Sequence, residues 1–168
     1  MIKRFLSFLF LCIICSGCII DKESDSGLKP GDGLPDFSVI MNDGSIMTDD
    51  MLKGKVSVVM FFHTGCSDCQ RTLPVVQDVY DEFALKNVVF VLISREEGKD
   101  EIEAYWRKNG LDMPYSAQND RTVYELFAES RIPRIYINDR NGIIRSVFTD
   151  DPVPSFTDLK MSLESLIR

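Results

Sequence analysis

Two almost wholly apolar runs, VSVVMFFH at 56–63 and VVFVLIS at 88–94, constrain the fold of this chain more than any other feature. Runs without polar alternation are typical of strands that are covered on both faces of a sheet. Between them, apolar residues recur at spacings of four, three, four and three, which indicates one face of a helix. These residues are Cys69, Leu73, Val76, Tyr80 and Phe83. Two buried strands joined by a helix predict a right-handed unit with a parallel strand pair.

The sequence on either side of this unit adds further elements. They are a strand at 37–41, a short helix after Thr48, helices at 99–108 and 122–129, a hairpin over 134–148, and a C-terminal helix capped by Ser155 and Asp158. This order predicts an α/β fold, a three-layer α/β/α sandwich with a mixed central sheet.

The N-terminus carries the pattern of an export signal, in which a basic pair precedes an apolar stretch at 5–14. That stretch is too short for a spanning helix. Cys18 follows two small residues and resembles the acylated cysteine of the bacterial lipobox, although Cys15 stands where Leu is usual. We therefore expect a lipoprotein signal peptide at 1–17 and a lipid on Cys18, with an ordinary cleaved signal or an uncleaved anchor as alternatives.

Residues 18–33 are polar and rich in Gly, Ser and Asp, so they are expected to form a flexible, lipid-anchored tether to one domain at 34–168. The whole chain carries a formal net charge of −7, and removal of the signal would take away two basic residues. An acidic chain repels nucleic acid, so a nucleic-acid role is excluded.

The remaining cysteine pair, Cys66 and Cys69, lies where the strand at 56–63 gives way to the helix. This C-x-x-C spacing is typical of thiol–disulfide exchange sites. Cys66 begins the helix, where backbone N–H groups and the helix dipole stabilise a thiolate, so it is predicted to be the attacking nucleophile. Cys69 lies one turn further on and deeper, and it is predicted to resolve the mixed disulfide that forms.

Three other uses of this pair fit the sequence less well. A structural zinc needs four ligands, whereas the mature chain offers two thiols and His63, so no metal is expected. A structural disulfide between residues this close would close too small a loop to stabilise the fold. A peroxidatic cysteine is expected in a P-x-x-x-T-x-x-C context, which the chain does not have.

At these residues the chain resembles the thioredoxin superfamily, specifically the TlpA/ResA-like extracytoplasmic thiol–disulfide oxidoreductases, over essentially all of 34–168. FFHTGCSDC with Pro74 is similar to the family's FWATWC-x-x-C-x-x-x-x-P. RIPRIYINDRNG at 131–142 is similar to G-V-P-T-x-F-x-I-D-x-x-G. The resemblance implies a thioredoxin-like fold, in which Pro133 is a cis-proline that faces the cysteines and shapes the groove for the client.

The site departs from the family pattern at three positions. Gly65 stands where Trp precedes the first cysteine, which widens the approach to Cys66. Met60 replaces the buried acid of thioredoxins, and Thr72 replaces the Glu that TlpA/ResA-like proteins often carry. Both acids that usually transfer protons at such a site are therefore missing. Their absence affects the rate of proton transfer from Cys69, not the thiol–disulfide exchange itself.

Three nearby residues are candidate modulators of the thiols. Asp68 lies between the cysteines, where its charge disfavours the Cys66 thiolate and makes the couple more reducing, unless it is simply solvated. His63 either interacts with the thiols or only packs at the strand end. Arg134 either stabilises the thiolate, binds an acidic partner or points into solvent. Glu96-Glu97 is expected to form a charged, solvated loop.

We therefore predict an extracytoplasmic, membrane-tethered thiol–disulfide oxidoreductase that reduces protein disulfides without a cofactor. Its partners would be a client protein with a disulfide, a membrane electron donor, and the membrane itself through the lipid on Cys18. The resemblance implies a monomer, held on the periplasmic side or at the outer membrane. The alternative is a redox-weak thioredoxin-fold binding protein that holds a peptide, a thiol or copper at the same site.

Overall fold

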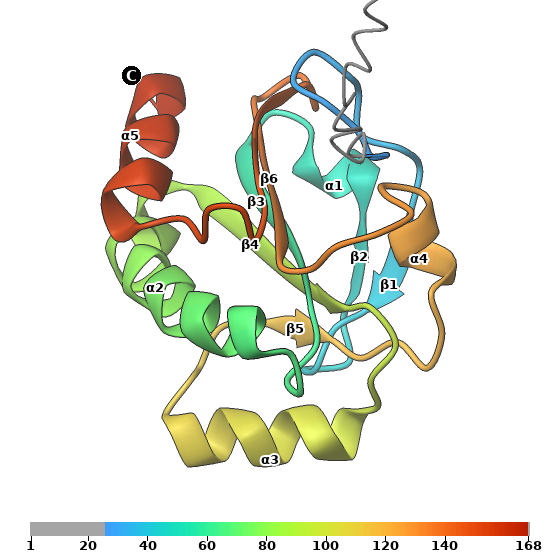
Figure 1. Ribbon diagram of the computed structural model, residues 1–168. Helices are drawn as coiled ribbons and strands as arrows, with labels where there is room; N and C mark the ends of the chain where they lie inside the picture. The colour runs from blue at the N-terminus through green and yellow to red at the C-terminus, as the bar shows by residue number, and fades with distance from the viewer. Residues whose placement is uncertain (1–25, 168) are drawn as a thin grey trace, which may run out of the picture.

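The computed structural model describes residues 26–167, and a mixed five-stranded sheet lies at its centre (Figure 1). The strands are β3 (Val56–Phe62), β4 (Val88–Ser94), β5 (Tyr115–Ser116), β6 (Arg134–Asn138) and β7 (Ile144–Phe148), in the order β5-β4-β3-β6-β7. β4 runs parallel to β3 and β5 parallel to β4, whereas β6 is antiparallel to β3 and β7 antiparallel to β6. The α/β class and the mixed sheet expected from the sequence are confirmed.

Helices cover both faces of this sheet (Figure 1). They are α1 (Asp49–Leu52), α2 (Ser67–Phe83), which a 3-10 turn at Ala84–Lys86 extends, α3 (Lys99–Asn109), α4 (Thr122–Glu125) and α5 (Phe156–Ile167). Successive residues of a strand point to opposite faces, and on β3 Phe61 packs against Tyr124 of α4, whereas Phe62 packs against Trp106 of α3. The central strand therefore lies between two helical layers. A separate antiparallel hairpin, β1 (Ser38–Ile40) with β2 (Ile46–Thr48), precedes α1.

The burial of β3 explains its apolar sequence. All seven residues of β3 and six of the seven residues of β4 are buried. α2 turns the face that was predicted from its spacing toward these strands, with Cys69, Leu73, Val76 and Phe83 buried and Tyr80 packed on Phe90. The helix that carries the cysteine pair is thus fixed on the two central strands.

Two helix ends show how hydrogen bonds set the boundaries of the helices. Before α5, the N–H and the hydroxyl of Ser155 donate to Asp158 Oδ2 at 2.8 and 2.6 Å, so the predicted cap is confirmed. α4 ends at Glu125 rather than at the predicted residue 129. Beyond it the Phe127 carbonyl accepts the Leu28 N–H at 2.9 Å, and this pairing replaces further helical turns.

One strand of the sheet was not predicted. β5 has only two residues, too few to show a pattern of apolar and polar positions. Its outer edge is held by Asn42, whose N–H donates to the Tyr115 carbonyl at 2.7 Å and whose Oδ1 accepts the Tyr115 N–H at 3.1 Å. This strand is recognised only through contacts with a distant turn.

The flexible tether predicted at 18–33 needs correction over its second half. Leu28 N–H donates to Phe127, Gly31 N–H donates to the Ile144 carbonyl at 2.8 Å, and Ile144 N–H donates to the Asp32 carbonyl at 2.9 Å. The domain therefore begins by residue 26 rather than at 34, because backbone pairing holds this polar segment in place.

The signal peptide expected at 1–17 and the lipid site expected at Cys18 lie outside the described residues. Between residues 26 and 167, none of the helices has both the length and the apolar character needed to cross a membrane.

Candidate active site

The first cysteine lies at the start of α2. Cys66 is the N-cap residue, its carbonyl accepts the Gln70 N–H at 2.9 Å, and its own N–H donates to the His63 carbonyl at 3.0 Å. The side chain is half-buried, and its Sγ lies 3.7 Å from the Ile132 carbonyl oxygen. The first backbone N–H groups of α2 have no partner within the helix, so the thiol lies at the positive end of the helix dipole.

The second cysteine is buried one turn further on. Cys69 has no exposed surface, and both cysteines are free thiols. Burial raises the pKa of the Cys69 thiol far above its ordinary value, and the nearby Cys66 adds to this effect. A backbone hydrogen bond from His63 and the charge of Arg95 oppose it less strongly. The two thiols therefore differ in their surroundings. The Cys66 thiol is partly exposed, whereas burial favours the protonated form of the Cys69 thiol.

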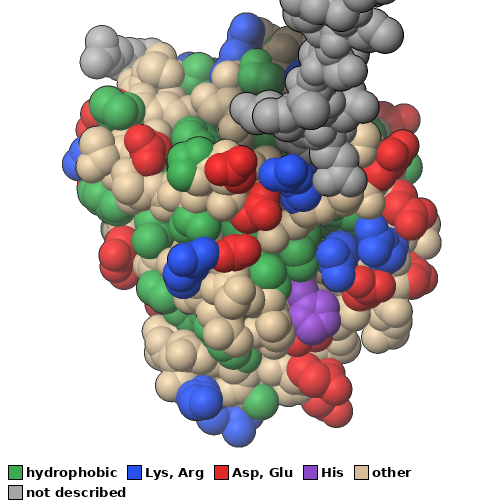
Figure 2. Space-filling view, in the orientation of Figure 1, with side chains coloured by type: hydrophobic (Ala, Val, Ile, Leu, Met, Phe, Trp, Pro, Cys, Tyr) green, Lys and Arg blue, Asp and Glu red, His purple; other side chains and the backbone are tan. Residues whose placement is uncertain are grey.

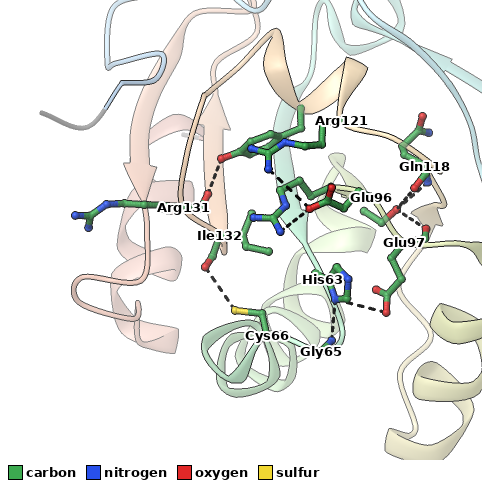
Figure 3. Close-up of polar contacts among 12 residues, drawn as sticks. His63, Gly65, Cys66, Glu96, Glu97, Gln118, Arg121, Arg131 and Ile132 are labelled. Atoms are coloured by element: carbon green, nitrogen blue, oxygen red, sulfur yellow. Dashed lines mark hydrogen bonds and ion pairs between the residues drawn. The ribbon is translucent and has the colours of Figure 1, made fainter. Parts of the chain in front are cut away.

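The loop before β6 faces Cys66. The peptide bond between Ile132 and Pro133 is cis, as the resemblance implied. The Ile132 carbonyl is a hydrogen-bond acceptor for Cys66 Sγ, so the residue before Pro133 borders this sulfur (Figure 3).

A buried carboxylate beside this loop was missed in the sequence. Glu97 is only 7% exposed, it accepts the Thr64 N–H at 2.8 Å through Oε2, and the Thr64 hydroxyl donates to Oε1. The expectation that Glu96-Glu97 forms a solvated loop is therefore wrong for Glu97. The residue is buried because β3 and β4 end side by side, so that the loops that follow them meet. Only the parallel register could have revealed this.

His63 lies between that carboxylate and the cysteine loop. Its Nδ1 accepts the Gly65 N–H at 2.9 Å and lies 3.7 Å from Glu97 Oε1. A Cβ on Gly65 would lie 3.2 Å from the imidazole ring, so the ring occupies space that a larger residue at position 65 would need. His63 does more than pack at a strand end, because it fixes the loop that leads to Cys66.

A pocket of about 290 Å³ opens beside the reactive thiol. It is lined by His63, Gly65, Cys66, Arg95 and Ile132. The imidazole of His63 is visible on the surface at this point (Figure 2). The pocket is open to solvent over the partly exposed thiol of Cys66.

Two of the predicted modulators, Arg134 and Asp68, do not line this pocket. Arg134 is completely buried, its Nη2 donates to the Ser130 carbonyl at 3.2 Å, and a Cβ on Gly27 would lie 2.4 Å from its Nη1. Arg134 therefore does not point into solvent, because the segment from residue 26 covers it. Asp68 forms an ion pair with Arg71 one turn along α2, on the outside of the helix.

The two positions at which related proteins carry an acid, 60 and 72, hold no group here that could replace it in proton transfer. Met60 is buried in β3, and the buried Thr72 uses its hydroxyl to donate to the Asp68 carbonyl at 2.8 Å. Among residues 26–167, no three His, Cys, Asp or Glu side chains are grouped closely enough to hold a metal ion.

Known proteins are similar to this chain in sequence. The chain is similar to thiol-disulfide oxidoreductase ResA of Bacillus subtilis, with 25% identity over 142 residues that cover 84% of this chain and 78% of that protein. It is 24% identical to ResA of Geobacillus thermodenitrificans over 136 residues, covering 81% of this chain and 77% of that protein.

Solved structures show the same fold. A thiol:disulfide interchange protein of the thioredoxin family from Chlorobium tepidum superposes with a TM-score of 0.71 at 23% identity, over 84% of this chain and 99% of that chain. The thioredoxin domain of a thiol-disulfide oxidoreductase from Bacteroides vulgatus gives a TM-score of 0.72 at 22% identity, with the same coverage. The thioredoxin-like fold and the resemblance to ResA-like proteins are thereby confirmed. The AhpC/TSA family model matches residues 30–147, and the chain belongs to that family.

Proposed function

We propose that this protein is an extracytoplasmic, membrane-tethered thiol–disulfide oxidoreductase that reduces disulfides of client proteins through Cys66 and Cys69. The observation that carries the proposal is the asymmetry of the pair. The half-buried thiol of Cys66 lies at the N-terminus of α2 and lines a pocket, whereas the thiol of Cys69 is fully buried. The similarity to proteins named thiol-disulfide oxidoreductase supports the same reaction class.

The reaction transfers two electrons and two protons. The Cys66 thiolate attacks one sulfur of the client disulfide, the client S–S bond breaks, and the leaving sulfur takes a proton. Cys69 then loses its proton and attacks Cys66 Sγ, which releases the second client thiolate to be protonated. The client ends as a dithiol and the protein as a Cys66–Cys69 disulfide.

The buried acid has a positioning role in this scheme. Glu97 holds Thr64 by two hydrogen bonds and lies next to His63, and these residues form the loop that ends at Cys66. The loop therefore keeps its shape while Cys66 alternates between thiolate, mixed disulfide and disulfide. Pro133 lies beside Ile132, whose carbonyl borders Cys66 Sγ, and it would shape the groove for the client.

The place of action follows from the N-terminal sequence. The export signal at 1–17 and the lipid on Cys18 would hold the domain on the outer side of a membrane, as a monomer. A reductase in that compartment must be reduced again after each turnover, so a membrane electron donor is part of the proposal.

A second candidate is a binding protein with the same fold and weak redox activity. Gly65 favours it, because the missing side chain leaves the 290 Å³ pocket open to a peptide or thiol. The two candidates differ in whether Cys66 forms covalent intermediates.

The test is to trap the intermediate with Cys69→Ser. Removal of the resolving thiol should leave clients attached to Cys66, so mixed disulfides that dithiothreitol releases should accumulate in cells. Cys66→Ser and the double variant are the matched controls, and both should show none. If Cys69→Ser accumulates no adducts above the Cys66→Ser background, the reductase is refuted and the binding protein is favoured.

A further inference from the structure

The pocket at Cys66 contains one side chain with a permanent charge. Arg95 is the first residue after β4, and its N–H donates to the Phe62 carbonyl at 2.8 Å. This bond joins the ends of the two central strands, so the arginine stands beside the loop that leads to Cys66. Of the five residues that line the pocket, Arg95 is the cation, and none is a carboxylate.

The carboxylates nearby do not occupy this arginine fully. Arg95 Nη2 lies 2.6 Å from Glu96 Oε1, and Arg121 Nη1 lies 3.8 Å from the same oxygen. One carboxylate thus serves two guanidinium groups, and the other acid near Arg121 is the largely exposed Glu125 at 3.7 Å. Glu97 is turned away toward Thr64. Arg95 therefore keeps donor capacity, and it lines the pocket.

The other arginine near the cysteine does not compete for this role. Arg131 directly precedes Ile132, but its side chain points away from Cys66 (Figure 3). Asp150 Oδ1 lies 3.6 Å from its Nη1. A client that binds over Cys66 would meet Arg95 as a charged side chain in the lining of the pocket.

We propose that the clients carry Asp or Glu within one or two residues of the cysteine that Cys66 attacks, and that this carboxylate binds Arg95. The inference rests on the proposed function, because it names the substrate class of the same thiol exchange. An ion pair at this position holds the client sulfur over the pocket and leaves the electron and proton transfers unchanged. It also gives an acidic protein a local attraction for acidic segments, which its net charge of −7 would otherwise repel.

The test compares three matched peptides with the reduced full-length protein. Each is acetyl-Ala-X-Cys-Ala-amide, with Glu, Gln or Lys at X, as a mixed disulfide with uncharged 2-mercaptoethanol. The rate of Cys66–Cys69 disulfide formation is followed by acid quenching, alkylation and mass analysis, with Cys66→Ser as the background. The Glu peptide should react roughly fivefold faster than the Lys peptide, the size expected of a partly exposed ion pair.

Variants assign the preference to one residue. Arg95→Gln should bring the Glu-to-Lys rate ratio close to one, and Arg95→Lys should restore most of it. Arg107→Gln is the control of equal charge change, because Arg107 is exposed on α3 and pairs with Glu103, and it should keep the full ratio. In the wild-type protein, added salt should bring the two rates together.

The outcomes separate the inference from the function. Equal rates with all three peptides, or a ratio that survives Arg95→Gln, would overturn the inference and leave the reductase intact. If no peptide oxidises the wild-type protein above the Cys66→Ser background, both are overturned.

Discussion

The two loops that follow the central parallel strands form the site together, but they differ in how far the sequence alone identifies them. The loop after β3 carries the cysteine motif, and its chemistry can be read from spacing alone. The loop after β4 carries Arg95 and Glu97, which have no motif of their own. The register that pairs Phe62 with Ser94 brings the two loops side by side. In the proposed function, the first loop supplies the reacting thiols, and the second supplies the charge and hydrogen bonds around them.

The comparison of the two loops is tested most strongly by substitutions of Glu96 and Glu97 in the loop after β4. Glu97→Ala removes a buried acceptor of two hydrogen bonds from Thr64, so it should lower the free energy of unfolding by about 1.5–3 kcal/mol. Glu96→Ala is the matched control, because its carboxylate is partly exposed, and it should cost about 1 kcal/mol or less. Urea unfolding of the reduced proteins measures both. Equal losses would show that Glu97 does not organise the site.

The first loop is tested by the pH dependence of stability. The folded state raises the pKa of the Cys69 thiol above its ordinary value of 9.0, so the unfolded state loses this proton first as the pH rises. The contribution is fully present below pH 9 and declines above it, at up to about 1.4 kcal/mol per pH unit. Relative to Cys69→Ala, the reduced wild-type protein should therefore lose unfolding free energy between pH 9 and 10.5. Parallel curves for the two proteins would contradict the burial of this thiol.

The elements that the sequence predicted well are those whose pattern is local. The apolar runs of β3 and β4, the spacing along α2 and the Ser155–Asp158 cap all depend on residues close in the chain. β5 could not be predicted, because its partner Asn42 is 73 residues away and the strand is too short to show a period.

Charged and polar residues were the least predictable part of the site. Glu97 was expected to be solvated, and Arg134 was expected to stabilise the thiolate, to bind an acidic partner or to point into solvent. Both side chains are buried, whereas isolated charges are usually exposed. The polar segment at 26–33 has the composition of a tether, yet its backbone pairs with Phe127, Glu129 and Ile144. In each case a contact distant in sequence overrides local composition.

The central claim, that Cys66 and Cys69 form a reducing dithiol, is tested most directly by the reduction potential of the pair. The full-length protein is equilibrated in graded dithiothreitol buffers and alkylated. The protein is then digested, and the mass of the peptide that contains Cys66 and Cys69 gives the number of alkylated thiols. Cys12, Cys15 and Cys18 therefore do not enter the count. A reversible two-electron transition at or below about −250 mV is the predicted result. A potential near about −120 mV, as in strong oxidants, or a pair that forms no reversible disulfide, would contradict the account.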